Sequence, residues 1–471
     1  MSFQSLSFFI FLALTGLLCL SVGRKNKAAA AGLLLVACGV FYLWSLDRQA
    51  LSGFLVLLGG AIISYGTVTG PKRKSVYLLA VCWHIGALLW FKCIGFFNPE
   101  LYRGWMPLGL SFFTFQQLWL LHESYTGEVI LRKQDGKDFL LYSFFFPSVT
   151  SGPILKPQNF FPQLKSERFL APDWQDVSAA LYAITLGTAK KVLLADPLGT
   201  VVANGWAMTD TLSAPGAWIT MLAYTLQLYL DFSGYCDIAA GCARLFGIRL
   251  PVNFNSPYRS LSVGEFWKRW HITLTSFLRE CLYFPLGGSR KGKLRTNLNL
   301  MIVFAVSGLW HGAGLQYLIW GLLHGGYQVV GRLVKPLTKP LRERLDASWL
   351  ALPGKWMRIA WVFFLTGIAW VFFRANDLDH AMLIFQQMAV GGGFGGAAAF
   401  GMVPAQLWLL GGCRGGLFVG DLICRKCDPV ERLANCVWLR YTVWTVLLLL
   451  VLCFGAYGTG YNAAEFGYFQ F

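Results

Sequence analysis

Apolar residues along this chain form long runs separated by short polar segments, and many of the runs are long enough to cross a membrane. The first is Leu6–Val22, and similar runs follow at Ala28–Leu46, Leu51–Thr69 and Val76–Phe97. A spanning helix needs about 20 predominantly apolar residues. The pattern therefore predicts that the chain begins with a series of transmembrane helices.

The next runs are shorter or interrupted. Leu108–Leu121 is aromatic, and the segment after it carries prolines at positions 147, 153, 157 and 162. Prolines at this density cannot continue one helix, and irregular backbone at membrane depth must be buried in protein or line a cavity. Around Ser151–Pro153 we expect a re-entrant, cavity-lining segment or an interfacial loop. The run Leu181–Val202 contains Lys190, Lys191 and Asp196, so it is expected to dip into the membrane or lie at its surface.

Two carboxylates, Asp231 and Asp237, lie within the apolar run 218–248. Acidic residues inside a membrane usually face a polar interior, so both are candidates for lining a tunnel. The alternatives are an ion pair with Arg244 or Arg249, and a helix break that brings both acids near the interface.

The C-terminal part adds further runs around a glycine-rich patch at Gly391–Gly401: Trp356–Phe373, Met402–Val419 and Val437–Tyr457. The pattern predicts about eleven spans with re-entrant pieces. We expect a single integral membrane domain, 1–471, with N-terminal spans in 1–105, a catalytic core in 106–334 and C-terminal spans and an aromatic tail in 335–471.

Composition and charge agree with this class. The chain is 56% hydrophobic and 13% charged, whereas soluble domains carry about 25% charged residues. The net charge of +17 is concentrated between apolar runs, as the positive-inside rule requires, and not in the pattern of a nucleic-acid-binding surface. We therefore expect no nucleic-acid partner, an outer N-terminus and three basic loops in the cytoplasm: Arg24–Lys27, Lys72–Lys74 and Lys291–Arg295. Cys424 and Cys427 are expected to be reduced loop cysteines, with a metal site as the alternative.

Three of the six histidines lie between Ser262 and Tyr327. Ser262 and Glu265 have the S-x-x-E spacing of a capping box, which predicts a helix from Val263. Such a helix is amphipathic and suits the membrane face, because apolar residues share one side while Lys268, Ser276 and Arg279 lie on the other. The apolar side comprises Trp267, Trp270, Leu274, Phe277 and Cys281, and His271 turns toward it.

A second helix is expected just after Arg295. His311 would then lie about 24 Å along it, at the tip of a hairpin that bends at Gly312 and returns through Leu315–Val330. A neutral imidazole in this place suits a general base that removes a hydroxyl proton. The alternative is a hydrogen-bonding brace between helices. Of the three histidines, His311 is the strongest catalytic candidate, His271 follows and His324 is expected to contribute least.

The segments RWHITLTSFLRECLYFPLGGSRKG and GLWHGAGLQYLIWGLLHG resemble the membrane-bound O-acyltransferase family. They are most similar to its bacterial branch, which contains the alginate O-acetyltransferase membrane subunits and the D-alanyl transfer proteins of teichoic acids. The similarity extends to YTLQLYLDFSGYCDIAAGCARLFGI, to SGPI at 151–154 and to the ending EFGYFQF.

This resemblance implies a funnel-shaped helical bundle with a tunnel that meets at the histidines. His311, in WHG, matches the catalytic histidine of the family, and His271, in RWH, matches a second polar position that assists it. The resemblance further implies transfer of an acyl group from a cytoplasmic thioester to a hydroxyl, with no bound cofactor. Acetyl-CoA is the donor in the acetylating members, and the acetyl group is passed to a periplasmic esterase-like partner.

We therefore expect an acetyltransferase subunit of the bacterial inner membrane that works with a polysaccharide secretion complex. Alginate is the first candidate for the acceptor, and cellulose and peptidoglycan come next. The residues expected to line the donor tunnel are Trp267, Lys268, Arg269, Trp310, Asp231 and Asp237. The rival hypotheses are a transporter that uses Asp231 and Asp237 as coupling acids and a non-catalytic scaffold.

Overall fold

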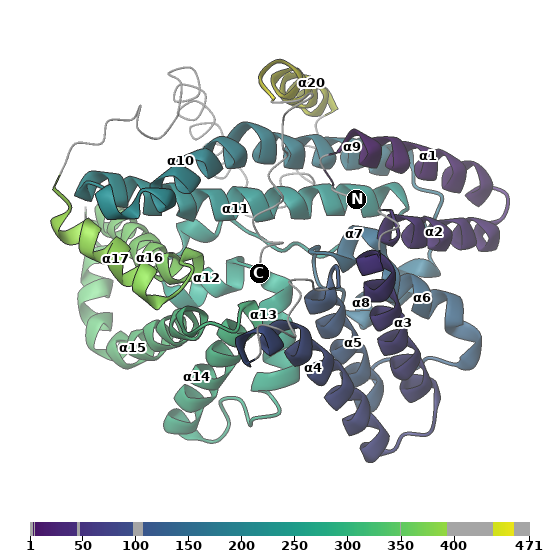
Figure 1. Ribbon diagram of the computed structural model, residues 1–471, viewed down its shortest axis with the longest axis horizontal. Helices are drawn as coiled ribbons and strands as arrows, with labels where there is room; N and C mark the ends of the chain where they lie inside the picture. Colours follow the sequence, from purple (N-terminus) through teal and green to yellow (C-terminus); the bar gives the residue numbers. More distant parts are fainter. Residues whose placement is uncertain are drawn as a thin grey trace. The chain divides into compact units, whose positions relative to one another are not determined.

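The computed structural model describes residues 3, 5–44, 48–97, 107–348, 350–392 and 437–455 (Figure 1). Every regular element in these ranges is a helix. The expected all-α class is confirmed. Four sequence predictions fall wholly or largely outside the described residues: the Gly391–Gly401 patch, the span Met402–Val419, the loop with Cys424 and Cys427, and the aromatic tail Glu465–Phe471.

The chain forms two compact units. The first comprises Met1–Ala189, Ser233–Val252 and Cys427–Gln470, and the second comprises Lys190–Phe232, Asn253–Lys426 and Phe471. One division falls inside the long helix α11 (Ala214–Leu245), between Phe232 and Ser233.

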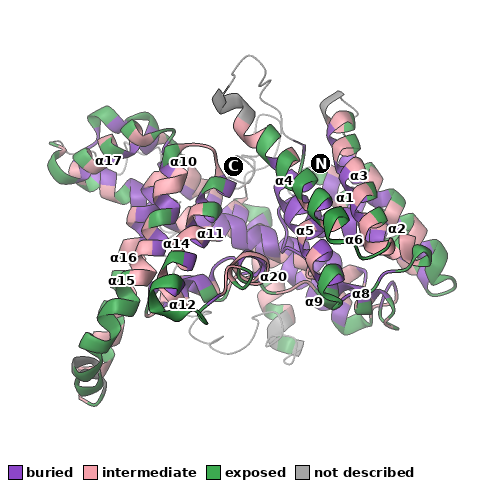
Figure 2. Cartoon of the chain, turned by 90° about the horizontal axis from the view of Figure 1, so that it is seen from below, coloured by how far each residue is buried: buried purple, intermediate pink, exposed green. Residues whose placement is uncertain are grey.

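The N-terminal apolar runs form helices as predicted. Ser5 and Asn26 cap the first two, because their side chains accept hydrogen bonds from the backbone N–H groups of Phe8 and Ala29. Many large apolar side chains on these helices remain exposed (Figure 2), which is the surface that contact with lipid requires. The helices are α1 (Leu6–Gly23), α2 (Lys27–Tyr42), α3 (Arg48–Thr69) and α4 (Lys74–Phe97).

By length and composition, five helices in the described ranges could cross a membrane. They are Leu6–Gly23, Ala50–Thr69, Lys74–Cys93, Trp174–Ala207 and Ala351–Arg374. The total of about eleven spans also counts runs outside the described residues and stays a prediction.

The proline-rich segment is broken and buried. After α5 (Leu110–Thr126) come a single 3-10 turn, η1 (Lys133–Asp135), and three short α-helices, and every residue from 141 to 155 is buried. Tyr142 donates its hydroxyl hydrogen bond to the carbonyl oxygens of Gln116 (2.8 Å) and Leu155 (3.0 Å), so side chains satisfy part of this irregular backbone. Such burial favours the re-entrant interpretation over an interfacial loop. The short helices are α6 (Gly136–Phe144), α7 (Phe146–Val149) and α8 (Pro157–Leu164).

Elsewhere in the first unit, buried Asp176 on α9 (Trp174–Ala189) forms ion pairs with two arginines. Its Oδ1 lies 3.0 Å from Arg244 Nε and 3.2 Å from Arg249 Nη2. These are the two arginines considered as partners of Asp231 and Asp237. Helix α20 (Val437–Phe454) packs against α9, where the Trp444 indole donates to Thr185 Oγ1 at 2.9 Å.

Of the two alternatives for Leu181–Val202, the structure favours the segment that dips into the membrane, since it belongs to a helical stretch long and apolar enough to cross one. The chain continues from α9 through a π-helical turn, η2 (Lys190–Ala195), into α10 (Asp196–Ala207), and Lys191 is only 2% exposed. Lys191 can be buried because its charge is paired with those of Asp196 and Asp231.

The second unit is built around the hairpin of α14 (Gly292–His311) and α15 (Leu315–Asp346), against which α12 (Val263–Arg269) and α16 (Ala351–Arg374) also pack. The predicted hairpin is confirmed, although α14 begins before Arg295 and α15 extends through the basic residues 332–344. The remaining elements of the second unit are η3 (Thr209–Thr211), η4 (Pro257–Arg259), α13 (Ile272–Leu278), η5 (Arg279–Tyr283) and α17 (Leu378–Val390).

Two glycines let the hairpin helices approach closely. A Cβ at Gly308 would overlap the carbonyl oxygen of Tyr317, and a Cβ at Gly321 would overlap that of Phe304. The close approach fixes the position of the hairpin tip, where His311 lies.

Candidate active site

His311 is the last residue of α14, at the bend that leads into α15. Its side chain is buried, and its ring lies 4.5 Å from Trp310, 5.0 Å from Trp320 and 4.9 Å from Phe373, measured between ring centroids. Gly312 follows in an extended conformation that ends the helix. His311 thus occupies the hairpin tip that its sequence position predicts.

His271 lies at a break that the sequence did not predict. The helix that begins at Val263 ends at Arg269, and a second one starts at Ile272. Between them His271 has a φ of +43°, in the left-handed region that residues other than glycine rarely adopt. Strained backbone of this kind is often held at functional sites by its surroundings. The expected single amphipathic helix is therefore wrong, although its N-terminal cap is confirmed by the Glu265 N–H bond to Ser262 Oγ at 3.1 Å.

Asn253 supports this break with its side-chain oxygen. Asn253 Oδ1 accepts hydrogen bonds from the backbone N–H of Thr273 (3.1 Å) and from its hydroxyl (2.9 Å), and it lies 3.2 Å from His271 Nδ1. Because an amide oxygen can only accept, His271 Nδ1 must carry the proton. In the neutral imidazole the lone pair is then on Nε2, so His271 presents a base at that nitrogen.

All three histidines of the second unit's central stretch belong to one array of aromatic rings. Trp310 lies 6.4 Å from His271 and 4.5 Å from His311. His311 also contacts Trp320 at 5.0 Å, and Trp320 contacts His324 at 5.1 Å. We call these five residues the histidine array. It shows that the sequence-predicted residues His271, Trp310 and His311 come together in the fold.

The other predicted tunnel residues near the histidines divide into two groups. Trp267 is buried and donates its indole N–H to His324 Nδ1 at 3.2 Å, so it joins the edge of the array. Lys268 is exposed. Arg269 pairs with Glu265 at 2.9 Å and donates to the Asn255 carbonyl oxygen at 3.1 Å, contacts that hold α12 and the loop before it.

Asp231 is held in a buried ion-pair cluster that sequence reasoning missed. Lys191 Nζ lies 2.7 Å from Asp231 Oδ1 and 2.9 Å from Asp196 Oδ1, and the Lys191 and Asp231 side chains are each 3% exposed. A lysine in an apolar run needs a carboxylate partner, and this rule was the available signal. The alternative of a helix break near Asp231 and Asp237 is wrong, since α11 is continuous through both residues. Asp237 belongs to the first unit and is half-buried.

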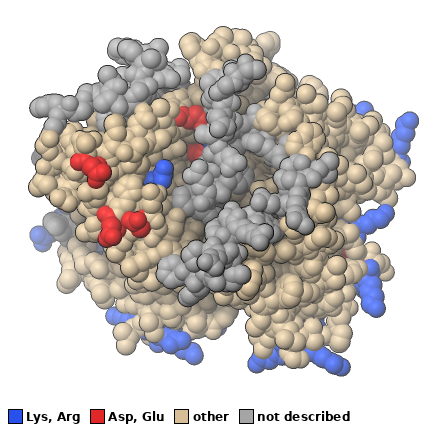
Figure 3. Space-filling model, in the orientation of Figure 1, with Lys and Arg blue, Asp and Glu red and all other residues tan. Residues whose placement is uncertain are grey.

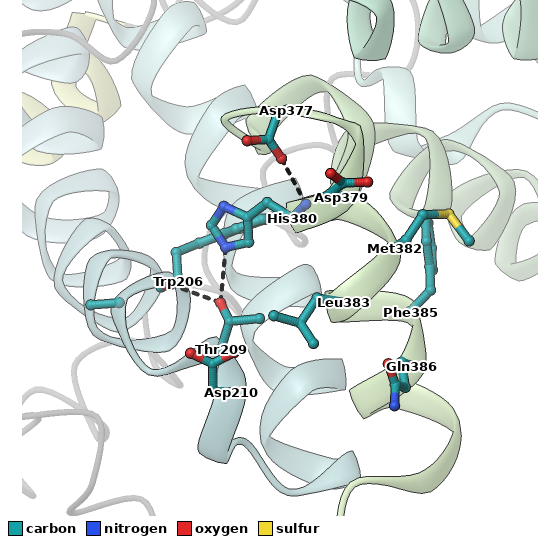
Figure 4. Close-up of a pocket in the computed structure, with 11 residues that line it drawn as sticks. Trp206, Thr209, Asp210, Asp377, Asp379, His380, Met382, Leu383, Phe385 and Gln386 are labelled. Atoms are coloured by element: carbon teal, nitrogen blue, oxygen red, sulfur yellow. Dashed lines mark hydrogen bonds between the residues drawn. The ribbon is translucent and has the colours of Figure 1, made fainter.

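A pocket of about 970 Å³ lies elsewhere in the second unit, between η3 and α17 (Figure 4). Its lining includes three exposed carboxylates, Asp210, Asp377 and Asp379, and acidic side chains gather toward α17 on the face shown in Figure 3. His380 Nε2 lies 3.0 Å from Thr209 Oγ1, which donates to the Trp206 carbonyl oxygen at 2.7 Å. The pocket contains none of the predicted catalytic residues.

Comparison with known proteins matches residues 73–373 to the model of the membrane-bound O-acyltransferase family. This chain belongs to that family. The O-acyltransferase is 33% identical over 378 residues to a peptidoglycan O-acetyltransferase of Helicobacter pylori, covering 71% of this chain and 70% of the relative. It is 34% identical over 375 residues to the probable alginate O-acetylase AlgI of Pseudomonas putida, covering 76% of this chain and 74% of that relative. A teichoic acid D-alanyltransferase of Bacillus subtilis is 30% identical over 227 residues, covering 46% and 56%.

The matched region contains the whole histidine array of this multi-pass membrane O-acyltransferase. Transfer of an acyl group to a hydroxyl requires a group that removes the hydroxyl proton and a site from which water is excluded. The array offers both, because imidazoles lie among buried indole rings. Among the described residues, no group of three or more histidine, cysteine or acidic side chains is placed to hold a metal ion.

Proposed function

We propose that this O-acyltransferase takes an acetyl group from acetyl-CoA in the cytoplasm and delivers it across the bacterial inner membrane for O-acetylation of a cell-surface polysaccharide. The observation that carries the proposal is the buried histidine array, with His311 at the tip of the α14–α15 hairpin. The names of the relatives support the acceptor class, since alginate, peptidoglycan and teichoic acid all lie outside the cytoplasmic membrane. Alginate is the first candidate, and cellulose and peptidoglycan are the alternatives.

In the proposed reaction His311 is the general base. The acceptor hydroxyl attacks the thioester carbonyl carbon while His311 takes its proton, the carbon–sulfur bond breaks, and the proton passes to the CoA thiolate. An equivalent route forms an acetyl-histidine at His311 before the hydroxyl attacks. His271 has its lone pair on Nε2, so it is suited to accept a hydrogen bond from the hydroxyl and orient it. Because Nε2 of His271 carries the lone pair and no proton, it cannot donate a hydrogen bond to an oxyanion.

The donor is proposed to enter from the basic end of the hairpin. Lys291, Lys293 and Arg295 at the start of α14 are exposed, and clustered cations near an entrance attract the phosphates of CoA. By the positive-inside rule we expect that end to face the cytoplasm. Along α14 the distance from this end to His311 is about 30 Å, so the thioester has to reach His311 through the protein.

Sided membrane vesicles test this proposal. In inside-out vesicles, which present the cytoplasmic face, the protein should transfer radiolabelled acetyl from added acetyl-CoA. Right-side-out vesicles from the same cells should transfer none, because CoA does not cross the membrane. Vesicles that contain the His311→Ala variant at equal expression are the matched control. Equal transfer by both vesicle types, or transfer that is unchanged in the variant, would refute the proposal.

The transporter alternative receives less support from the fold. A coupling acid has to change its charge or its partner during transport. Asp231 is instead paired at 2.7 Å with buried Lys191, which also pairs with Asp196. This cluster fits a fixed brace between α11 and the η2–α10 segment.

A further inference from the structure

His324, which the sequence ranks last of the three histidines, has a defined tautomer. It lies on α15 and is fully buried. Trp267 Nε1–H donates to His324 Nδ1 at 3.2 Å, and an indole N–H can only donate. His324 Nδ1 must therefore be the acceptor, and the neutral ring carries its proton on Nε2. His324 thus presents a hydrogen-bond donor at the nitrogen where His271 presents a lone pair.

This donor has no acceptor within the part of the chain that the structure describes. His324 Nε2 is buried without a hydrogen-bond partner there, and so is Nε1 of Trp320, whose ring contacts His324 at 5.1 Å. Buried N–H groups in folded proteins are nearly always paired, because an unpaired donor destabilises the fold. An oxygen-bearing ligand at this place would satisfy both donors.

The position of His324 indicates which part of a ligand lies there. Trp320 contacts His311, and His324 follows one turn later, about 6 Å further along α15 and toward its basic end. If the acyl donor enters from the basic end and its thioester lies at His311, the rest of the donor extends along α15 past His324. In CoA that part carries an amide two methylene groups from the sulfur, and its carbonyl oxygen is a strong acceptor.

We propose that His324 Nε2–H donates a hydrogen bond to an amide carbonyl of the pantetheine arm of the acyl donor, with Trp320 Nε1–H as a second donor. The inference rests on the proposed function, since it assumes a thioester donor from the cytoplasm. His324 then binds the donor and does not take part in the proton transfer at His311.

Two variants of His324 with side-chain amides, each measured with two acyl donors, test the inference. In His324→Asn the side-chain oxygen replaces Nδ1 as acceptor for Trp267, but nothing replaces Nε2–H. In His324→Gln the side-chain amide places an N–H near the position of Nε2. KM and kcat are measured with acetyl-CoA and with S-ethyl thioacetate, a thioester without an amide, and thermal unfolding in detergent checks the fold of each variant.

We expect His324→Asn to raise KM for acetyl-CoA about three- to tenfold, the loss typical of one hydrogen bond, with kcat within twofold of the wild type. His324→Gln should recover most of this loss. With S-ethyl thioacetate the wild type and both variants should have the same KM. If the Asn variant does not fold, Trp320→Phe, which removes the second N–H donor, is measured in its place. A rise in KM for acetyl-CoA alone supports the inference, and an unchanged KM overturns it.

A KM for acetyl-CoA that is unchanged in folded His324→Asn would overturn the inference. An equal rise in KM for both donors, or a fall in kcat alone, would also overturn it and indicate a structural role through Trp320. In each of these cases acetyl transfer by the wild type leaves the proposed function intact. A wild type that neither binds nor consumes acetyl-CoA would instead refute the proposed function and the inference together.

Discussion

At the scale of single residues, the hydrogen-bond partner of each histidine determines what it can do. Asn253 makes His271 an acceptor at Nε2, and Trp267 makes His324 a donor at the same atom. These partners lie 18 and 57 residues away in the sequence. Motifs within a local segment could predict that the histidines matter, and they did place His311 at a hairpin tip. They could not predict a tautomer that depends on a distant side chain.

Replacing His311 should abolish acetyl transfer, because no other group in the array lies at the hairpin tip to take the proton of the acceptor hydroxyl. His271→Ala should lower the rate by roughly 10²–10⁴, the range typical of acid–base groups. Transfer of radiolabelled acetyl in inside-out vesicles measures both effects. His380→Ala is the matched control, since His380 lies at the separate pocket, and this variant should keep near-normal activity. Normal transfer by His311→Ala at equal expression would contradict the assignment.

Asn253 is expected to act only through His271. Replacement by leucine removes the oxygen that holds His271 Nδ1–H and supports the strained turn, so the rate should fall nearly as far as in His271→Ala. The double variant should be no slower than His271→Ala alone, because both changes remove the same positioned base. Asn253→Asp, which keeps an acceptor oxygen, is the conservative control and should retain more activity. Additive losses in the double variant would show that Asn253 has an independent role.

At the scale of helices, the sequence predicted elements that depend on neighbouring residues and missed those that depend on distant ones. The capping residue Ser262 and the α14–α15 hairpin were predicted correctly, because caps and apolar runs are local signals. The break at His271 has no proline or glycine to mark it, and the contacts of Asn253 hold it. Burial of Lys191 likewise depends on Asp231, which lies on another helix.

The hairpin provides a test at this scale with a control on the same helix. A methyl group at Gly321 would overlap the Phe304 carbonyl oxygen, so Gly321→Ala should push α15 away from α14. Crowding of this kind typically costs about 1–3 kcal/mol, and it should also lower activity by displacing Trp320 from His311. A Cβ added at Gly326 would meet no other atom within 4 Å. Gly326→Ala should therefore leave stability unchanged or raise it, since alanine favours helices by about 1 kcal/mol over glycine. Thermal unfolding in detergent compares the two variants, and equal melting temperatures would refute the argument.

At the scale of the whole molecule, the family match covers residues 73–373, and the sequence before it agrees with the structure as a set of apolar helices. Composition was sufficient for this level, because a chain with 56% hydrophobic residues has few alternatives to a helical membrane protein. The matched region contributes to both compact units, while the histidine array lies entirely in the second. The division of the chain into 1–105, 106–334 and 335–471 stays a prediction.

The buried array also limits what the molecule can acetylate directly. His311 is 5% exposed and is surrounded by Trp310, Trp320 and Phe373, whereas a polysaccharide needs an extended groove lined with polar groups. The acetyl group should therefore leave on a smaller acceptor, and we expect that acceptor to be the serine of a periplasmic esterase-like partner.

Purified protein in proteoliposomes tests this relay. With acetyl-CoA on the basic side and polysaccharide on the other, the chain alone should give no acetylated polymer, and addition of the partner to the outer side should start acetylation. The same mixture with His311→Ala should remain inactive, which separates the contribution of this chain from any activity of the partner. Because the relay requires the partner to receive the group, a partner that lacks its serine should also fail. Efficient acetylation of the polymer by the single chain would show that polysaccharide reaches His311 directly.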